Sequence, residues 1–252
     1  MITKLSLQVY NCGVKTSLGA NAGKCAADYI KKAIMKKGQA NIIMATGTAQ
    51  YETLKVLIAD QEIDWSKVVM FHLDEYIGIS ADHKASFRKF LTERFLDFVP
   101  PLKKTHLING NEDVDAELDY LNQEIAKYPI DLALIGIGEN GHLAFNDPPA
   151  NFETDVPFIK VQLDEACRTQ QVKEGWFPDL DAVPTHAVSM SIKHMLKSTA
   201  IVASIPDFRK AEPVYNTIFQ AIDPQYPSTM LRLHRDCHLF LDGESSSLIP
   251  NY

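Results

Sequence analysis

Short apolar runs rich in β-branched residues alternate with amphipathic segments along this chain. The apolar runs end in turn residues, as buried strands do, and they predict strands at residues 39–45, 67–73, 130–138, 198–205 and 237–242. Between them, apolar side chains recur at helical spacing and predict helices at residues 22–36, 49–59, 85–97, 113–127 and 208–221. Strands that alternate with helices are typical of βαβ units, so the pattern predicts an α/β fold with a mostly parallel sheet.

No internal repeat, low-complexity tract or Gly/Ser-rich linker interrupts this alternation. The two Pro-Pro pairs, at 100–101 and 148–149, indicate turns rather than domain boundaries. We therefore expect one domain over residues 1–252. The segment 161–183 is polar and contains proline, which predicts a lid or cover over a site.

Composition and charge narrow the functional classes. The chain has 46% hydrophobic and 23% charged residues, as expected for a globular protein with a large core. The net charge is −7 and the longest basic cluster is Lys103 with Lys104, which argues against nucleic-acid binding. We find neither a run of ~18 apolar residues nor a basic and apolar leader, so we expect a cytoplasmic protein without a membrane partner.

The cysteine and histidine pattern argues against a metal site. The four cysteines are widely scattered, which predicts reduced thiols. His234 and His238 lie close to Cys237, but the segment 233–242 reads as a strand rather than as a set of converging ligands. We interpret these histidines as surface or core residues and predict no metal.

Polar residues follow several of the predicted strands. Small hydroxyl residues, a carboxylate, a histidine between a carboxamide and a carboxylate, and an Arg-Lys pair occur within residues 46–48, 74–76, 139–147 and 206–210. Open parallel sheets bind ligands beyond the carboxyl ends of their strands, so these residues are expected to converge. A few focused cations bind an anion even in an acidic protein. The pattern predicts a site for a phosphorylated metabolite.

The stretch GIGENGHLAFNDP, residues 136–148, has the glycine spacing of a dinucleotide-binding loop. Two prolines follow within eight residues of the last glycine, so the helix that this motif requires is not expected, and we predict no nucleotide cofactor. His142 instead lies close to Asn140 and Asp147 on a flexible loop. An imidazole whose tautomer is fixed by a carboxylate transfers protons near neutral pH, although a structural histidine also fits this pattern.

Together with that loop, the blocks FHLDEYIGI (71–79), VPTHAVSMSI (183–192), PDFRKAEPV (206–214) and LFLDGESSSL (239–248) resemble the glucosamine-6-phosphate deaminase (isomerase) family. The resemblance extends over nearly the whole chain. Related 6-phosphogluconolactonases share the fold but typically continue their loop with Thr-Ala-Ser-Leu-Phe-Pro instead of Ala-Phe-Asn. The resemblance implies a Rossmann-like three-layer αβα sandwich. It also implies conversion of an amino-sugar 6-phosphate and water into a ketose 6-phosphate and ammonia, without a metal or nucleotide.

The resemblance also implies catalytic roles. His142 would open the sugar ring by acid/base catalysis, with Asp147 orienting it and Asn140 holding the site by hydrogen bonds. Asp74 would take the proton from C2 and return one at C1, giving an enolamine on the way to ammonia release. A carboxylate suffices as the base because the adjacent carbonyl or iminium carbon acidifies that proton. We interpret the neighbouring Glu75 as structural.

Phosphate and substrate binding would involve six residues: Thr46, Gly47, Thr48, Gly138, Arg209 and Lys210. The first three lie before the helix predicted at 49–59, whose amino terminus favours an anion. Lys210 matches the family's phosphate-binding lysine. A second phosphate-binding arginine of the family is not placed; Arg168 and Lys173 are candidates.

This chain departs from the family pattern at several positions. It has a single glycine in the phosphate turn, Asn at position 140 where some members have Asp, and Asp at 147 where Glu is usual. Residues 151–161 lack the basic set that follows the catalytic loop in members regulated by N-acetylglucosamine 6-phosphate, so we expect no such activation. A homo-oligomer is compatible with the resemblance, but no particular assembly is implied.

Three alternatives remain open. The same chemistry on galactosamine 6-phosphate would need only one altered hydroxyl contact. A 6-phosphogluconolactonase would use His142 to activate water against an ester carbonyl. A sugar-phosphate sensor without turnover would keep the pocket but lose catalysis at positions 140 and 147.

Overall fold

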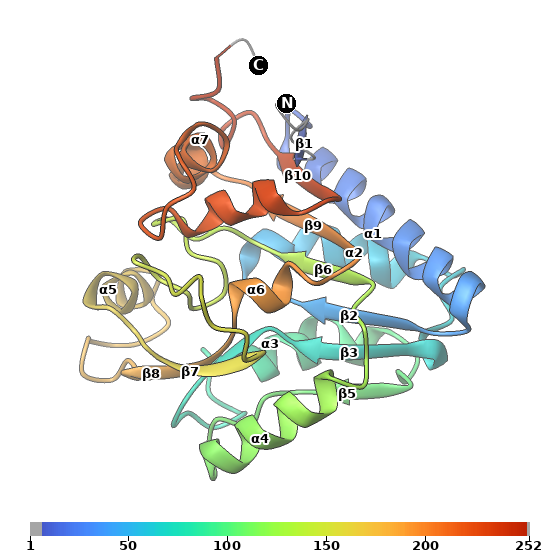
Figure 1. The fold of residues 1–252 in the computed structure, drawn as a ribbon, viewed down its shortest axis with the longest axis horizontal. Helices are drawn as coiled ribbons and strands as arrows, with labels where there is room; N and C mark the ends of the chain where they lie inside the picture. The colour runs from blue at the N-terminus through green and yellow to red at the C-terminus, as the bar shows by residue number, and fades with distance from the viewer. Residues whose placement is uncertain (1–6, 251–252) are drawn as a thin grey trace.

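The computed structural model describes residues 7–250 and shows an α/β fold (Figure 1). Seven strands form one sheet in the order β1-β10-β9-β6-β2-β3-β5, and every neighbouring pair is parallel. The five predicted strands are confirmed. The structure also has one strand at each edge of the sheet, β1 and β5, and these were not predicted because their sequences lack an apolar run. The strands are β1 (Leu7–Asn11), β2 (Ala40–Met44), β3 (Val68–His72), β5 (Lys104–His106), β6 (Leu132–Ile135), β9 (Ala200–Ile205) and β10 (Cys237–Leu241).

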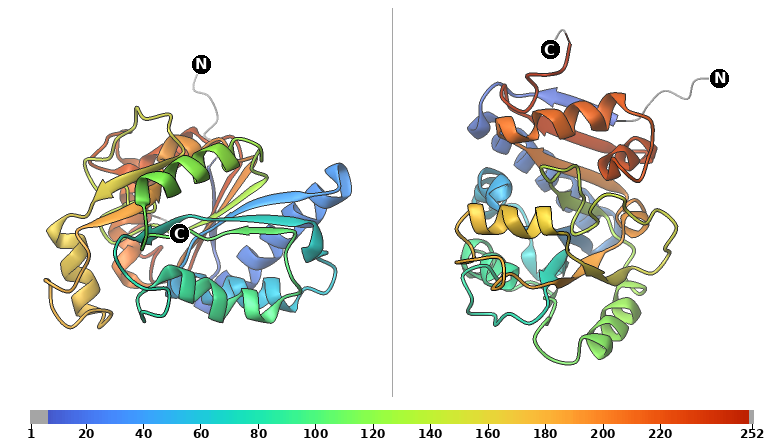
Figure 2. Two further views of the ribbon diagram at one scale, coloured as in Figure 1. Left: turned by 90° about the horizontal axis from the view of Figure 1, so that it is seen from below. Right: turned by 90° about the vertical axis from the view of Figure 1, so that its left-hand side faces the viewer.

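Helices cover both faces of this sheet (Figure 2). Successive residues of a strand point to opposite faces, so Ile42 packs beneath α1, α2 and α3, while Ile43 belongs to the core under α4 and α7. The predicted three-layer αβα arrangement is therefore confirmed. The helices are α1 (Lys15–Lys37), α2 (Tyr51–Ala59), α3 (Phe87–Arg94), α4 (Val114–Ile125), α5 (Glu165–Lys173), α6 (Ile192–Met195) and α7 (Ala211–Phe219).

Helix α1 begins seven residues before its predicted start at residue 22. Its first turns contain small residues instead of an apolar stripe, because α2 packs very closely against them. A Cβ atom on Gly19 would lie 2.1 Å from Cβ of Glu52, and one on Gly23 would lie 2.5 Å from Cβ of Val56. The prediction placed the helix start too late because it relied on periodic apolar side chains, and the first turns have small residues in their place.

A second, three-stranded antiparallel sheet was not predicted. It consists of β4 (Asp74–Tyr76), β8 (His186–Met190) and β7 (Phe158–Gln162), in that order. Leu73 connects the two sheets, since its N–H donates to the carbonyl of Met44 and its carbonyl accepts from the N–H of Met190. Asp74 therefore begins a strand of the small sheet and does not end a strand of the large one.

The segment 233–242 forms a strand only from Cys237 onward, so the prediction of a strand around His234 is wrong. The ring of His234 lies in the preceding turn, with Nε2 2.8 Å from the carbonyl oxygen of Ser198.

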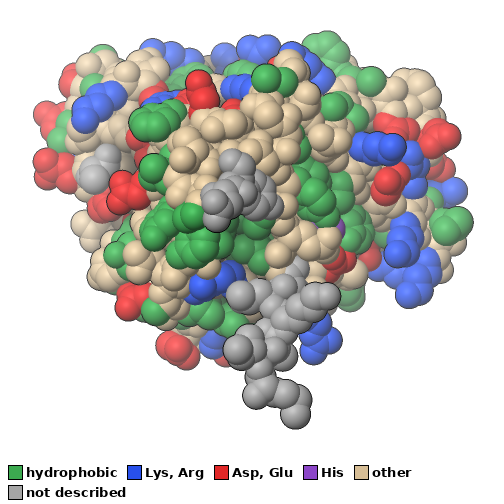
Figure 3. Space-filling view, turned by 90° about the horizontal axis from the view of Figure 1, so that it is seen from above, with side chains coloured by type: hydrophobic (Ala, Val, Ile, Leu, Met, Phe, Trp, Pro, Cys, Tyr) green, Lys and Arg blue, Asp and Glu red, His purple; other side chains and the backbone are tan. Residues whose placement is uncertain are grey.

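Within residues 7–250, no cluster of three or more His, Cys, Asp or Glu could hold a metal ion. None of the described helices is long and apolar enough to span a membrane. One face is shown in Figure 3, where basic, acidic and apolar side chains are interspersed.

Candidate active site

A cavity of about 220 Å³ opens beyond the carboxyl ends of the central strands. Its walls include the loops after β9, β6, β2 and β3, which are consecutive in the sheet. The chain passes from β2 to β3 on one side and from β6 to β9 on the other, so the strand order reverses between β2 and β6. Open parallel sheets bind ligands at such a point. The predicted site residues that line the cavity are Thr46, Gly47, Thr48, Asp74, Gly138, His142, Arg209 and Lys210.

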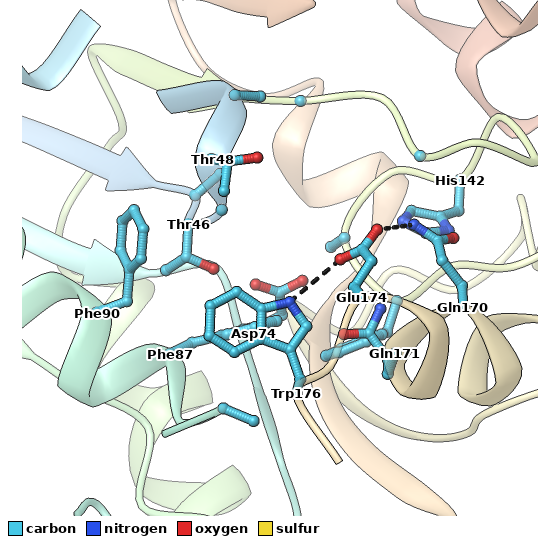
Figure 4. Close-up of a pocket in the computed structure, with 18 of the residues that line it drawn as sticks. Thr46, Thr48, Asp74, Phe87, Phe90, His142, Gln170, Gln171, Glu174 and Trp176 are labelled. Atoms are coloured by element: carbon cyan, nitrogen blue, oxygen red, sulfur yellow. Dashed lines mark hydrogen bonds between the residues drawn. The ribbon is translucent and has the colours of Figure 1, made fainter. Parts of the chain in front are cut away.

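The loop after β2 forms one wall of the cavity (Figure 4). Gly47 has a φ of 96°, a left-handed conformation that a side chain would strain. The short 3₁₀ helix η1 (Thr48–Gln50) follows and leads directly into α2. The buried side chain of Gln50 donates from Nε2 to the carbonyl of Ile135 at 2.9 Å, which joins this loop to the end of β6. The backbone amides at the start of η1 are thereby held beside the cavity, where they suit an anion.

Asp74 lines the cavity and is only 7% exposed. Its backbone is fixed because it pairs with Ser189 of β8 directly after the connecting residue Leu73. Burial, and then the nearby negative charge of Glu75, raise the pKa of Asp74 to about 8. A carboxyl group with this pKa is poised between its acid and base forms near neutral pH, as an acid/base catalyst requires.

Glu75 has a structural environment, in agreement with its interpretation from the sequence. Glu75 is not among the residues that line the cavity, and its carboxylate accepts hydrogen bonds from the N–H groups of Tyr76, Phe87 and Arg88 and from the hydroxyl of Ser86. These donors hold the start of α3 against β4. Glu75 is fully buried, so its charge acts on Asp74 with little screening by water.

The loop after β6 brings His142, Asp147 and Asn140 together. Nδ1 of His142 lies 3.0 Å from Oδ1 of Asp147, and Nδ2 of Asn140 donates to the same oxygen at 2.9 Å. The backbone N–H of His142 donates to Oδ1 of Asn140 at 3.0 Å. Burial opposes ionisation of Asp147, but the hydrogen bonds from His142 and Asn140 outweigh it and lower its pKa. An ionised Asp147 fixes the ring with its proton on Nδ1, so Nε2 is left to exchange protons with a ligand.

The absence of a side chain at Gly138 leaves space for the imidazole ring of His142. A Cβ atom at position 138 would lie 2.3 Å from Cε1 and Nε2 of His142, a separation that no side chain tolerates. The N–H of Gly138 also donates to the carbonyl of His142 at 3.0 Å. The glycine that resembled part of a nucleotide motif therefore leaves room for the histidine ring.

Two adjacent cations follow β9 but have different surroundings. The guanidinium group of Arg209 forms ion pairs with Asp207 and Glu139, both at 2.9 Å, and with Glu174 at 3.5 Å. The half-buried ammonium group of Lys210 makes no hydrogen bond or ion pair with any of the described residues. Burial is the largest cause of the lowered pKa of Lys210. Lys210 is thus the better candidate for capturing an anion.

Part of the segment 161–183, which the sequence predicted to be a lid or cover, forms a further wall of the cavity. Trp176 donates from Nε1 to Glu174 at 3.2 Å, and Gln170 donates to the same carboxylate at 2.8 Å (Figure 4). Lys84 donates to the carbonyl of Gly175 at 2.7 Å. These contacts place α5 and the residues after it over the cavity, where the sequence predicted a cover. The Trp-Phe pair at 176–177, within an otherwise polar segment, was the available signal. The other aromatic residues of the wall are Tyr51, Phe87, Phe90 and Phe145.

Comparison with known proteins agrees with this geometry. The family described as glucosamine-6-phosphate isomerases/6-phosphogluconolactonase matches residues 14–240. The chain belongs to this family. The resemblance seen in the sequence motifs is therefore confirmed.

Two relatives within the family are glucosamine-6-phosphate deaminases. The protein from Thermoanaerobacter sp. (strain X514) is 36% identical over 234 residues, which cover 90% of this chain and 91% of the relative. The protein from Streptococcus pneumoniae serotype 4 (strain ATCC BAA-334 / TIGR4) is 31% identical over 237 residues, covering 94% and 99%.

Solved structures give the same picture. A monomeric glucosamine-6-phosphate deaminase superposes with a TM-score of 0.86 at 30% identity, covering 96% of this chain and 99% of that one. A 6-phosphogluconolactonase from Trypanosoma brucei has a TM-score of 0.78 at 14% identity, covering 98% and 100%. The second similarity shows a shared fold only.

The two candidates for the family's second phosphate-binding arginine lie elsewhere. Arg168 donates from its NH2 group to the carbonyls of Leu180 and Val183, so its guanidinium group holds the loop after α5. Lys173 is exposed at the end of α5. Neither residue lines the cavity among the described residues. The cations that do are Lys84, Arg209 and Lys210.

Proposed function

We propose that this protein is a glucosamine-6-phosphate deaminase, which converts glucosamine 6-phosphate and water into fructose 6-phosphate and ammonia. The observation that carries the proposal is the convergence of Asp74, at the start of β4, and His142, from the loop after β6, on one cavity that Lys210 also lines. The two curated deaminases at 36% and 31% identity support it. The cavity therefore combines a base, a proton shuttle and an anion-binding cation.

Ring opening is the first step. Nε2 of His142 takes the proton of the C1 hydroxyl and delivers it to the ring oxygen, so the C1–O5 bond breaks and an aldehyde forms. Asp147 stabilises the imidazolium ion that exists between the two transfers, and Asn140 holds Asp147 in place.

Isomerisation and deamination follow on the open chain. Asp74 takes the C2 proton, which the adjacent aldehyde acidifies, and O1 receives a proton from the substrate's own 2-ammonium group, which gives a neutral enolamine. Asp74 then returns its proton to C1, leaving an iminium group at C2. Water adds to this carbon and ammonia leaves, which gives the ketose phosphate.

The test is ammonia release from glucosamine 6-phosphate and from galactosamine 6-phosphate, with hydrolysis of 6-phosphogluconolactone measured in parallel. We expect glucosamine 6-phosphate to give the highest kcat/KM. A higher kcat/KM for the galactosamine epimer would mean that galactosamine 6-phosphate is the substrate. Lactone hydrolysis without ammonia release would mean that the protein is a 6-phosphogluconolactonase. Binding of a sugar phosphate without any turnover would indicate a sensor.

Lys210→Ala should mainly weaken binding. We expect KM to rise by about 10- to 100-fold with a smaller change in kcat, because the ammonium group attracts the phosphate in the ground state and in the transition state alike. Steady-state kinetics measures both constants. Lys32→Ala, on the exposed side of α1, is the control. A kcat effect that exceeds the KM effect would contradict phosphate capture by Lys210.

Gly138→Ala should displace the His142 ring, because the added Cβ overlaps it. A displacement of about 1 Å costs up to roughly a hundredfold in rate, so we expect kcat to fall by about 10- to 100-fold. Gly136→Ala is the matched control, since a Cβ there meets nothing closer than Nε2 of Gln50 at 3.7 Å. Equal activities of the two variants would show that the ring tolerates displacement.

A further inference from the structure

The loop that carries His142 is attached to the small sheet through the hydroxyl of Ser189, a fully buried residue of β8. Oγ of Ser189 accepts a hydrogen bond from the backbone N–H of Phe145 at 3.0 Å, and Nδ2 of Asn146 donates to it at 3.3 Å. Both donors belong to the part of the loop between His142 and Asp147. This hydroxyl therefore holds the stretch of chain that separates the imidazole from its carboxylate partner.

The side chain of Asn146 makes a second link from the loop to β8. Its Nδ2 donates to the carbonyl of Met190 at 2.8 Å and, within the loop, to the carbonyl of Leu143 at 2.7 Å. The N–H of Met190 in turn donates to the carbonyl of Leu73, the residue directly before Asp74. The loop is thus connected, through one residue of β8, to the segment that carries the proposed base.

The strand register places Ser189 directly opposite Asp74, because the antiparallel pairing of β4 with β8 matches these two residues. Side chains at directly opposite positions of an antiparallel pair lie on the same face of the sheet, with Cβ atoms about 4.5–5.5 Å apart. Glu75, the next residue of β4, points to the other face. The hydroxyl that holds the His142 loop is therefore a close neighbour of the proposed base.

The loop depends on such support because its backbone is strained. Ala144 has a φ of 52°, a left-handed conformation that alanine rarely adopts. A turn closes around it, in which the N–H of Asn146 donates to the carbonyl of Leu143 at 3.1 Å. Strained backbone persists where surrounding contacts fix it, and Ser189 and Asn146 supply those contacts here. Ala144 and Phe145 line the cavity, so relaxation of this turn would move part of its wall.

We propose that Ser189 is a positioning residue that fixes the His142 loop against the strand of Asp74. The inference rests on the proposed function only for the reaction that the two groups perform. His142 would act at C1 and the ring oxygen, whereas Asp74 would act at C2 and C1 of the same sugar. Both must reach one bound substrate, and a misplacement of about 1 Å costs up to roughly a hundredfold in rate. Ser189 sets their separation, since it binds the loop at the position opposite Asp74.

Replacing Ser189 by alanine tests this role, since it removes the acceptor of the Phe145 N–H. We expect kcat to fall by about 10- to 100-fold with KM changed by less than about threefold, because Lys210 is unchanged. Ser189→Thr keeps the hydroxyl in a residue that suits a strand, and it should keep kcat within about threefold. Ser204→Ala is the matched control: it removes a similarly buried strand hydroxyl, which lies 2.8 Å from that of Thr53, at a position that does not line the cavity. It should lose stability to urea as Ser189→Ala does, but keep full activity.

Infrared titration of the ligand-free protein gives a readout that is independent of turnover. The pKa of Asp74 is raised to about 8, first of all by burial. Release of the loop admits water to the cavity, so the carboxyl band of Asp74 should titrate about one pH unit lower in Ser189→Ala. The band should not move in Ser189→Thr or Ser204→Ala, and Asp74→Asn assigns it.

A kcat of Ser189→Ala equal to that of Ser189→Thr or of Ser204→Ala, or an unmoved band in Ser189→Ala, would overturn the inference. Failure of the wild type to release ammonia would refute the proposed function. The infrared titration would then still report whether Ser189 holds the loop against Asp74.

Discussion

Asp74→Asn should abolish ammonia release, with kcat lower by about 10³-fold or more, because an amide cannot accept the C2 proton. The same variant should bind a hexitol 6-phosphate nearly as well as the wild type, since Lys210, which we propose captures the phosphate, is unchanged. Asp82→Asn, in the exposed loop that follows β4, is the matched control and should keep full activity. Substantial turnover by Asp74→Asn would show that another group is the base.

The same substitution should stabilise the protein. The pKa of Asp74 is raised to about 8 in the folded state, so between its ordinary value and pH 8 the folded protein holds a proton that the unfolded chain releases. The stability of the wild type therefore declines across this range, while that of the asparagine variant has no such contribution. We expect a difference of about 1–2 kcal/mol at pH 8 that fades toward pH 4, measured by urea unfolding. An equal or lower stability of the variant at pH 8 would mean that burial does not disfavour the ionised form of Asp74.

The pH dependence of catalysis should have a steep rising limb. The base must be ionised, and burial and the charge of Glu75 place the pKa of Asp74 at about 8. Well below that pH the ionised fraction falls tenfold per unit, so kcat/KM is expected to rise by about fiftyfold from pH 6 to pH 8 and by about a further twofold before it levels off. The profile reports the free enzyme, in which the cavity has no bound sugar to alter this carboxyl group.

Ionisation of the substrate must be separated from that of the enzyme. The second ionisation of a phosphate monoester has a pKa near 6, so binding of a hexitol 6-phosphate should be measured over the same pH range and its variation divided out. Infrared titration then provides a direct check, because the carboxyl band that disappears near pH 8 in the wild type should be missing in Asp74→Asn. A corrected profile that is flat between pH 6 and pH 8 would contradict the raised pKa.

Much of the fold followed from local pattern. The strands β2, β3, β6, β9 and β10 are buried apolar runs, and the helices between them have apolar stripes, so periodicity identified both. The second sheet was missed because β4 is short and β7 is only half-buried, and because β4 pairs with residues of β8 more than a hundred positions away. The sequence therefore placed Asp74 correctly after the strand at 67–73, but it did not predict that Asp74 begins a strand of a second sheet.

The candidate site likewise has some features that the sequence predicted and others that only the folded structure decided. The sequence by itself determined which residues follow the strands and that His142, Asn140 and Asp147 are neighbours, because turn chemistry and short spacing are local properties. The tertiary structure decided the ion pairs of Arg209, the wall formed by α5 and Trp176, the space that Gly138 leaves for the His142 ring, and the raised pKa of Asp74. Each of these depends on burial or on contact between distant segments, and such contacts exist only once the chain has packed.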